Sequence, residues 1–161
     1  MSNFVLTIKL KVMLQVIKHR LDVWAEQPQY WEHMLAIDKG LYASSVSRTL
    51  IELIKIRASQ INKCVYCIDY HTSQAISQGE TARRIFLLSA WEESPLFTDI
   101  EKAVLKATEE ITHISENGLT DPTYQNLERY FTKPEIADLI VMICHINFLN
   151  RVGIATRTVA T

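Results

Sequence analysis

Two capping boxes mark where long helices begin in this chain, and together with the scarcity of glycine and proline they restrict it to a helical fold. Each box places a threonine three residues before a glutamate, so both side chains can pair with free N–H groups of the first turn. One box, Thr98 to Glu101, begins a helix to about residue 113, and the other, Thr132 to Glu135, begins the longest helix, to about residue 157. Only 4 glycines and 4 prolines interrupt the 161 residues. These signals predict an all-α fold.

Further helix starts and ends are predicted before residue 98 and between the two capping boxes. Pro28 suits a first turn and begins a helix to about residue 42, and one of the serines at 44, 45 and 47 can cap the next, from Val46 to about residue 61. Gly79 is a typical left-handed end for the helix that holds two cysteines. We expect another helix from residue 80 to about 91 and a short one from Pro122. The chain is therefore predicted to be a single domain of six to seven helices, a helical bundle.

Residues 1 to 18 have a different pattern. Apolar and polar side chains alternate from Leu6 to Val16, which is typical of a strand. The lysines at 9, 11 and 18 interrupt the apolar stretch that a signal peptide needs. We interpret this segment as an N-terminal extension, either an arm that pairs with another subunit or a disordered tail, and residues 19 to 161 as the domain.

The composition argues against several function classes. With a net charge of −1, the chain lacks the excess of basic residues that binds nucleic acid. We expect no membrane span, because no uninterrupted apolar run reaches roughly 18 residues. Three cysteines are too few for a disulfide-stapled secreted protein, so we expect a cytoplasmic location.

The segment from Cys64 to His71 contains the side chains best suited to catalysis or metal binding. Cys64, Cys67 and His71 stand at i, i+3 and i+7, so a helix would place both thiols and the imidazole on one face. In a reducing compartment a Cys-x-x-Cys pair is more often catalytic or metal-binding than structural. Two simpler interpretations stay open: a pair of small buried side chains, or a structural bridge whose short loop would add at most roughly 2 kcal/mol.

With Glu52 separated from Cys64 by eleven residues, these residues form a Glu, Cys-x-x-Cys-x-x-x-His pattern. It resembles that of the alkylhydroperoxidase D-like branch of the carboxymuconolactone decarboxylase family, and the similarity extends from about residue 20 to residue 157. The best-known members carry a histidine where this chain has Tyr66.

The resemblance implies an all-helical homo-oligomer that acts as a thiol-dependent peroxidase, with no cofactor and no metal. Cys67 would attack the hydroperoxide and Cys64 would resolve the product as a disulfide, while Glu52 and His71 relay protons. A dithiol electron donor, such as a lipoyl protein or a thioredoxin-like protein, would reduce the disulfide.

Other residues have simpler explanations. Glu52 shares a helix face with Arg48, Lys55 and Ser59, opposite the apolar stripe, which equally fits a solvated ion pair. Cys144 lies in an apolar run and is expected to be a buried, inert thiol. The histidines at 19, 33, 113 and 145 are expected to have no catalytic task. Core, interface or pocket-entrance positions are expected for the aromatic residues Trp24, Trp31, Trp91 and Phe97.

Two alternative functions remain for the chain as a whole. Cys64, Cys67, His71 and Glu52 could supply four ligands to a zinc-binding helical module, although the second ligand pair that usually accompanies Cys-x-x-Cys is missing. A cofactor-free decarboxylase or lactone enzyme on the same fold would not depend on the cysteine pair.

Overall fold

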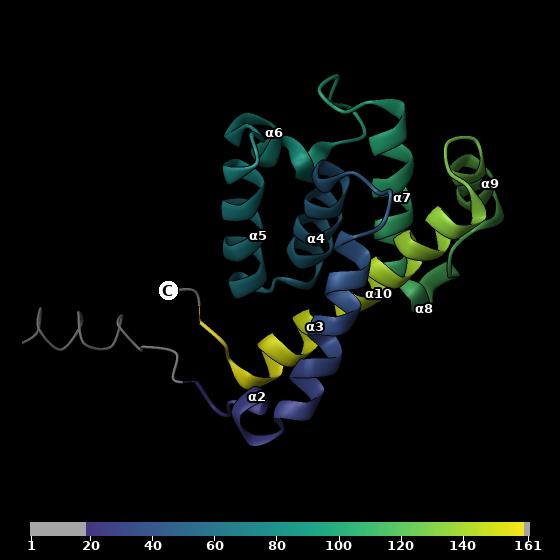
Figure 1. Cartoon of the computed structure of the whole chain (residues 1–161). Coiled ribbons are helices and arrows are strands. Elements are labelled where there is room, and N and C mark those ends of the chain that lie inside the picture. Colours follow the sequence, from purple (N-terminus) through teal and green to yellow (C-terminus); the bar gives the residue numbers. More distant parts are fainter. Residues whose placement is uncertain (1–18, 160–161) are drawn as a thin grey trace, which may run out of the picture.

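The computed structural model describes residues 19 to 159, and the regular structure in this range is entirely helical (Figure 1). The helices are α2 Val23–Glu26, α3 Pro28–Tyr42, α4 Arg48–Asn62, α5 Val65–Ser77, α6 Ala82–Leu87, the 3-10 turn η1 Leu88–Ala90, α7 Asp99–Thr112, α8 Ile114–Asn117, α9 Asp121–Glu128 and α10 Lys133–Thr156. The prediction of a single all-α domain is confirmed. The N-terminal extension, residues 1 to 18, lies outside the described residues.

Both capping boxes are present where the sequence predicted them. The backbone N–H of Glu101 donates to the Thr98 hydroxyl at 3.3 Å, and that of Thr98 donates to the Glu101 carboxylate at 2.8 Å. At the start of α10, the N–H and the hydroxyl of Thr132 each donate to the Glu135 carboxylate at 2.8 Å. α5 ends just before Gly79, whose φ of +96° is the left-handed conformation expected of a helix stop.

The described residues form nine α-helices rather than the predicted six or seven. α2 and α8 are additional single turns of 4 residues each. The helix predicted from residue 80 to 91 begins later, after Thr81, and tightens into η1. Ile85, Leu88 and Trp91 are all buried at a spacing of three residues, which suits a 3-10 turn better than an α-helix.

α4 lies at the centre of the fold, where it packs against α5, α7 and α10 (Figure 1). Its buried residues lie on every side of the helix and are Leu50, Ile51, Glu52, Leu53, Ile54, Lys55, Ile56, Ala58 and Ser59. α4 is therefore a core helix, and the polar side chains among these residues need partners inside the protein.

α10 is long and apolar enough, by length and composition, to cross a membrane. The sequence predicted no such segment, because no uninterrupted apolar run in it is long enough to span a membrane. In the structure α10 packs against α3, α4, α5, α7 and α9. Its residues Leu139, Ile143 and Ile146 belong to the largest hydrophobic cluster, so α10 is a core helix of the bundle.

Candidate active site

A tight turn between α4 and α5 positions the two cysteines. Lys63 has a φ of +60° and ends α4 in a left-handed conformation, while the N–H of Cys64 donates back to the Ser59 carbonyl at 3.0 Å. Cys64 thereby becomes the N-cap of α5, and Cys67 falls in its first turn. Both are free thiols, and both are buried.

The two thiols ionise as a pair. A hydrogen bond from Cys67, assisted by backbone N–H groups of the first turn of α5 and by the amide of Asn150, lowers the pKa of Cys64 to about 6. The same hydrogen bond to Cys64, together with burial, raises the pKa of Cys67. The first negative charge of the pair therefore resides on Cys64, and the remaining proton resides on Cys67.

Glu52 and His71 form a buried pair, and His71 lies one turn after Cys67 on α5. His71 Nδ1 lies 2.9 Å from Glu52 Oε2, and the Tyr42 hydroxyl donates to the other carboxylate oxygen. Burial opposes ionisation of Glu52, but the hydrogen bonds from His71 and Tyr42 prevail and lower the pKa of its carboxyl. Burial also lowers the pKa of His71. A neutral imidazole that donates from Nδ1 to a charged carboxylate retains Nε2 as a proton acceptor.

A second polar group extends from this pair towards α3 and α10. Lys55 Nζ donates to Asp38 Oδ1 at 2.7 Å and to the Tyr42 hydroxyl at 3.2 Å. Next to this ion pair, His145 Nδ1 lies 3.8 Å from Asp38 Oδ1. Since Tyr42 also donates to Glu52, it links the two groups through its hydroxyl. Hydrogen bonds thus connect side chains from α3, α4 and α5, and His145 of α10 lies next to them.

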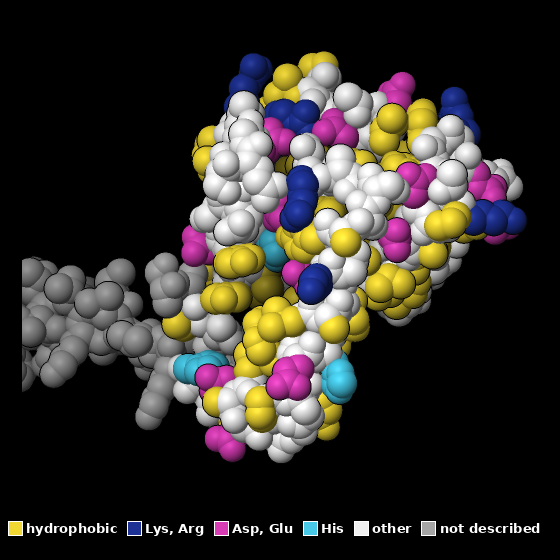
Figure 2. All heavy atoms as spheres, in the orientation of Figure 1, with side chains coloured by type: hydrophobic (Ala, Val, Ile, Leu, Met, Phe, Trp, Pro, Cys, Tyr) yellow, Lys and Arg dark blue, Asp and Glu magenta, His cyan; other side chains and the backbone are white. Residues whose placement is uncertain are grey.

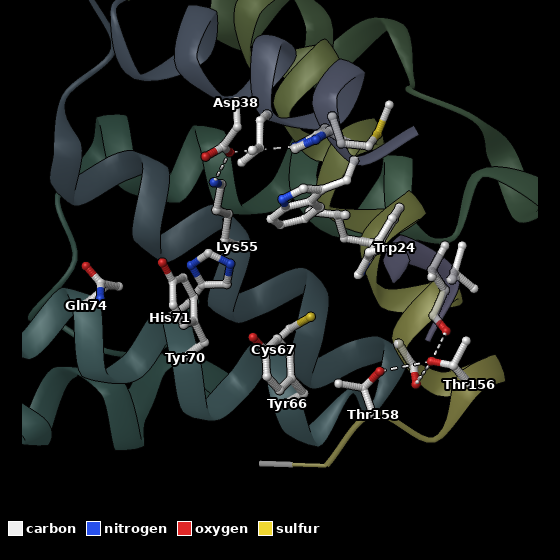
Figure 3. Close-up of a pocket in the computed structure, with 18 of the residues that line it drawn as sticks. Trp24, Asp38, Lys55, Tyr66, Cys67, Tyr70, His71, Gln74, Thr156 and Thr158 are labelled. Carbon is white, nitrogen blue, oxygen red and sulfur yellow. Dashed lines mark hydrogen bonds and ion pairs between the residues drawn. The ribbon is translucent and has the colours of Figure 1, made fainter. Parts of the chain in front are cut away.

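These groups face a cavity of about 590 Å³. Figure 3 shows Asp38, Lys55, His71 and Cys67 around it, and Figure 2 shows apolar side chains gathered about a hollow on this face. Apolar residues make up much of the wall: Leu21, Val23, Trp24, Trp31, Met34, Leu35, Leu149 and Val152. The volume is typical of a site for a small organic molecule. Cys67 lines the cavity, whereas Cys64 lies behind it, close to Gly153 of α10.

Residues 28 to 110 match the sequence profile of the carboxymuconolactone decarboxylase family. The chain belongs to this family. The matched segment contains Glu52, Cys64, Cys67 and His71, so the resemblance inferred from these residues is confirmed at the level of the carboxymuconolactone decarboxylase family.

Three known proteins are similar along most of the chain. The uncharacterized protein YdfG of Bacillus subtilis (strain 168) is 38% identical over 139 residues, which cover 86% of this chain and 95% of YdfG. A protein of unknown function from Agrobacterium tumefaciens, described as a candidate AhpD antioxidant defence protein, is 32% identical with a TM-score of 0.86, over 89% of this chain and 99% of its own. The debrominase Bmp8 shares the fold at 18% identity, with a TM-score of 0.73 over 85% and 74% of the two chains. One fold therefore supports different reactions.

The structure brings together all four residues that the sequence singled out. Cys67 and His71 lie on the buried side of α5, Cys64 caps that helix, and Glu52 reaches His71 from α4. The alternative of a solvated ion pair for Glu52 is wrong, because its carboxylate is 1% exposed and pairs with His71. The polar face of α4, for which the sequence left both solvent exposure and a role in the site open, is buried and contributes to the site.

Cys144 was predicted to be buried, and this is wrong: it is exposed on α10. The buried positions of α10 include Leu139, Ile143, Ile146 and Asn150, a helical spacing that turns residue 144 outward. Of the aromatic residues, Trp24 and Trp31 line the cavity, whereas Trp91 and Phe97 belong to the second hydrophobic cluster.

Several cavity residues were not anticipated: Asp38, Tyr42, Lys55 and His145. Asp38 and Tyr42 stand four residues apart on the helix from Pro28, and Lys55 follows Glu52 by three, so a shared polar face on each helix was the available signal. His145 had no such signal within its apolar segment.

The zinc-binding alternative gains no support from the geometry. Among residues 19 to 159, no group of three or more His, Cys, Asp or Glu side chains is arranged to hold a metal ion. Both carboxylate oxygens of Glu52 already accept hydrogen bonds, from His71 and Tyr42.

Proposed function

We propose that this member of the carboxymuconolactone decarboxylase family is a thiol-dependent peroxidase that reduces hydroperoxides through Cys67 and Cys64. The supporting observation is a dithiol with one lowered pKa, whose second cysteine lines an organic-sized cavity that it shares with His71. A cavity-lining thiol, a proton acceptor in the same cavity and a second cysteine that is readily ionised are what thiol oxidation by a peroxide and closure of the disulfide need.

In the first step His71 Nε2 takes the proton of Cys67, and the imidazolium is stabilised by the Glu52 carboxylate, 2.9 Å from Nδ1. The Cys67 thiolate then attacks the peroxide, so that an S–O bond forms and the O–O bond breaks. The departing alkoxide takes the proton from His71. Cys67 is left as a sulfenic acid, oxidised by two electrons, and the hydroperoxide is reduced to an alcohol.

In the second step Cys64 attacks the sulfenic sulfur of Cys67. In the reduced pair Cys64 is already a thiolate near neutral pH, because its pKa is lowered to about 6. The S–S bond forms, hydroxide leaves, and a proton from solvent converts it to water. A dithiol donor, such as a lipoyl protein or a thioredoxin-like protein, then reduces the disulfide by thiol exchange and becomes a disulfide itself.

We expect one equivalent of an organic hydroperoxide to convert Cys64 and Cys67 of each subunit into a disulfide, without Cys144. The reason is that the two thiols share a helix terminus, whereas Cys144 is exposed elsewhere on α10. Thiol titration and peptide mapping before and after oxidation measure this, and reduction by dihydrolipoamide should restore both thiols. Unchanged thiols after peroxide treatment would contradict the peroxidase and favour cysteine-independent chemistry, such as a decarboxylase.

We also propose that the chain forms a closed homo-oligomer. Large apolar side chains remain exposed along α3, namely Tyr30, Trp31, Leu35 and Ile37. Exposed apolar patches of this kind commonly mark protein interfaces. Multi-angle light scattering at micromolar concentration should report a defined multiple of the chain mass, and replacing Leu35 and Ile37 with glutamate should reduce it. The same change at exposed Ile114 is the control, and a wild-type monomer would contradict the proposal.

A further inference from the structure

Three asparagine side chains are linked between α4 and α10, next to the turn that carries Cys64. Asn150 is 0% exposed and donates from Nδ2 to the Ser59 hydroxyl at 2.9 Å. Its Oδ1 accepts a hydrogen bond from Asn62 Nδ2 at 2.9 Å. The same nitrogen of Asn62 donates to Asn147 Oδ1 at 2.8 Å. The NH2 group of Asn62 therefore joins the other two amides.

Asn150 is the member of this group that reaches the thiols. A hydrogen bond from its side chain lowers the pKa of Cys64 and opposes the rise in the pKa of Cys67. The backbone geometry agrees with this contact. Gly153, one turn after Asn150 on α10, lies so close that a Cβ there would be 3.4 Å from Cys64 Sγ. Ser59, which accepts from the Asn150 amide, also accepts from the N–H of Cys64 through its carbonyl at 3.0 Å.

The effect of an amide on a thiolate depends on which end of the amide faces the sulfur. An N–H stabilises the negative charge, whereas a carbonyl oxygen in the same place repels it. Ser59 does not decide the orientation of Asn150, because a hydroxyl donates to an amide oxygen as readily as it accepts from an NH2 group. The orientation is therefore decided by the other partner of Asn150, which is Asn62.

Asn62 is itself oriented by Asn147. Asn147 Nδ2 donates to the Ile143 carbonyl at 2.9 Å, and its Oδ1 accepts from Arg151 Nη1 at 3.0 Å. A carbonyl only accepts and a guanidinium only donates, so the Asn147 amide has one allowed orientation. Asn62 must then turn its NH2 group to Asn147 Oδ1, and Asn150 must turn its oxygen to that NH2 group. The NH2 group of Asn150 is left on the side of the thiols.

We propose that Asn62 and Asn147 are positioning residues that keep the N–H of Asn150, rather than its oxygen, turned towards the cysteine pair. The inference rests on the proposed function only in its consequence, which is faster closure of the disulfide by a charged Cys64. Ionisation of the thiol requires no peroxide, so the inference is tested without one.

The ultraviolet absorbance of the thiolate, followed as a function of pH, tests the proposal. A Cys144→Ser background restricts the signal to the pair, and the midpoint of the reference protein should lie at the Cys64 pKa of about 6. Asn150→Leu removes the donor and should raise the midpoint by about one pH unit, as expected for a lost hydrogen bond to a charged group. Asn62→Leu should raise it by a smaller amount, about threefold in the ionisation constant, because the Asn150 amide is then free to turn.

A double variant and a matched control separate positioning from stability. If Asn62 acts through Asn150, the double variant Asn62→Leu, Asn150→Leu should have the midpoint of Asn150→Leu alone. The control is Thr112→Val, which removes a hydrogen bond that Asn147 Nδ2 donates at 3.0 Å but leaves both anchors of that amide in place. Because Thr112 is buried, this change should lower the Tm without moving the midpoint. The charged groups near the pair and its amides, Lys55 and Arg151, are kept in every variant.

Several results would overturn the proposal. An unchanged midpoint in Asn62→Leu would remove its positioning role, and an unchanged midpoint in Asn150→Leu would remove the donor. An equal rise in Thr112→Val would assign the effect to loosening of the whole group, and additive effects in the double variant would mean that Asn62 acts independently.

If Asn150→Leu does not fold, Asn150→Asp keeps the shape without an N–H and should raise the midpoint in its place. The expected midpoints in a protein that consumes no hydroperoxide would contradict the proposed function alone.

Discussion

Replacing Cys67 with serine should reduce hydroperoxide consumption to the rate of the buffer. Cys67 is the cysteine that lines the cavity, and a serine hydroxyl is not appreciably ionised near neutral pH, so His71 would have no reactive nucleophile to activate. The serine is nearly the same size as cysteine, so the fold should remain intact, which circular dichroism checks. Stopped-flow measurement of peroxide loss in the presence of a dithiol donor gives the rate.

The companion substitution, Cys64→Ser, should behave differently. It should consume one equivalent of hydroperoxide per subunit and then stop, with Cys67 trapped as sulfenic acid or as a mixed disulfide. Mass spectrometry with a sulfenic-acid reagent would identify the trapped residue. Cys144→Ser is the matched control and should turn over like the wild type, because Cys144 is exposed away from the pair. If Cys67→Ser keeps the first turnover and Cys64→Ser loses it, the roles are reversed.

The second large effect is expected at His71. His71→Ala should slow the first oxidation of Cys67 by about 10² to 10⁴-fold, the usual contribution of a positioned general base. Glu52→Gln should slow it less, since it removes the charge that stabilises the imidazolium but leaves the imidazole in the cavity. Both variants should still form the disulfide, given time. His113→Ala, at a half-exposed position, is the control for histidine removal.

The pH dependence separates the two cysteines. Because the pKa of Cys64 is lowered to about 6, its thiolate is present above that pH and is lost as the pH falls below it. Formation of the disulfide from the Cys67 sulfenic acid should therefore slow as the pH decreases and Cys64 becomes protonated, in the wild type and in His71→Ala alike. Stopped-flow traces across this range measure it, and an unchanged rate would remove Cys64 from the resolving role.

Helix starts were predictable because capping is a local interaction. Thr98 and Thr132 pair with glutamates three residues away, so the sequence contains both partners of each bond. The end of α4 was predicted at about residue 61 and lies at Asn62, but the left-handed conformation of Lys63 that follows it was not predicted. Such a conformation in lysine has no sequence signature comparable to Gly79.

The burial of the site residues could not be predicted from the pattern of each helix taken alone. A helical wheel placed Glu52 and Lys55 on a polar face, which is correct, but solvent does not cover that face. α3 and α5 lie over it and supply Tyr42, Asp38 and His71 as partners. Whether a polar face is solvent-exposed or buried depends on which helices pack on it, and this packing is a property of the tertiary structure.

Cys144 and His145 show the same limit in adjacent positions. Both belong to a nearly uniform apolar stretch of α10, where the sequence does not distinguish an inward side from an outward one. The structure exposes Cys144 and turns His145 into the cavity. Neighbouring residues on a helix point in different directions, so an exposed thiol is followed directly by a cavity-lining imidazole.

The lowered pKa of Cys64 also bears on the redox equilibrium of the pair. A group that stabilises the thiolate stabilises the reduced dithiol but contributes nothing comparable to the disulfide, in which no sulfur is charged. The reduction potential of the proposed disulfide is therefore raised relative to an ordinary cysteine pair. Electrons from a modest biological reductant would then flow readily to this site, and the resting enzyme would be kept in its reduced, peroxide-reactive form.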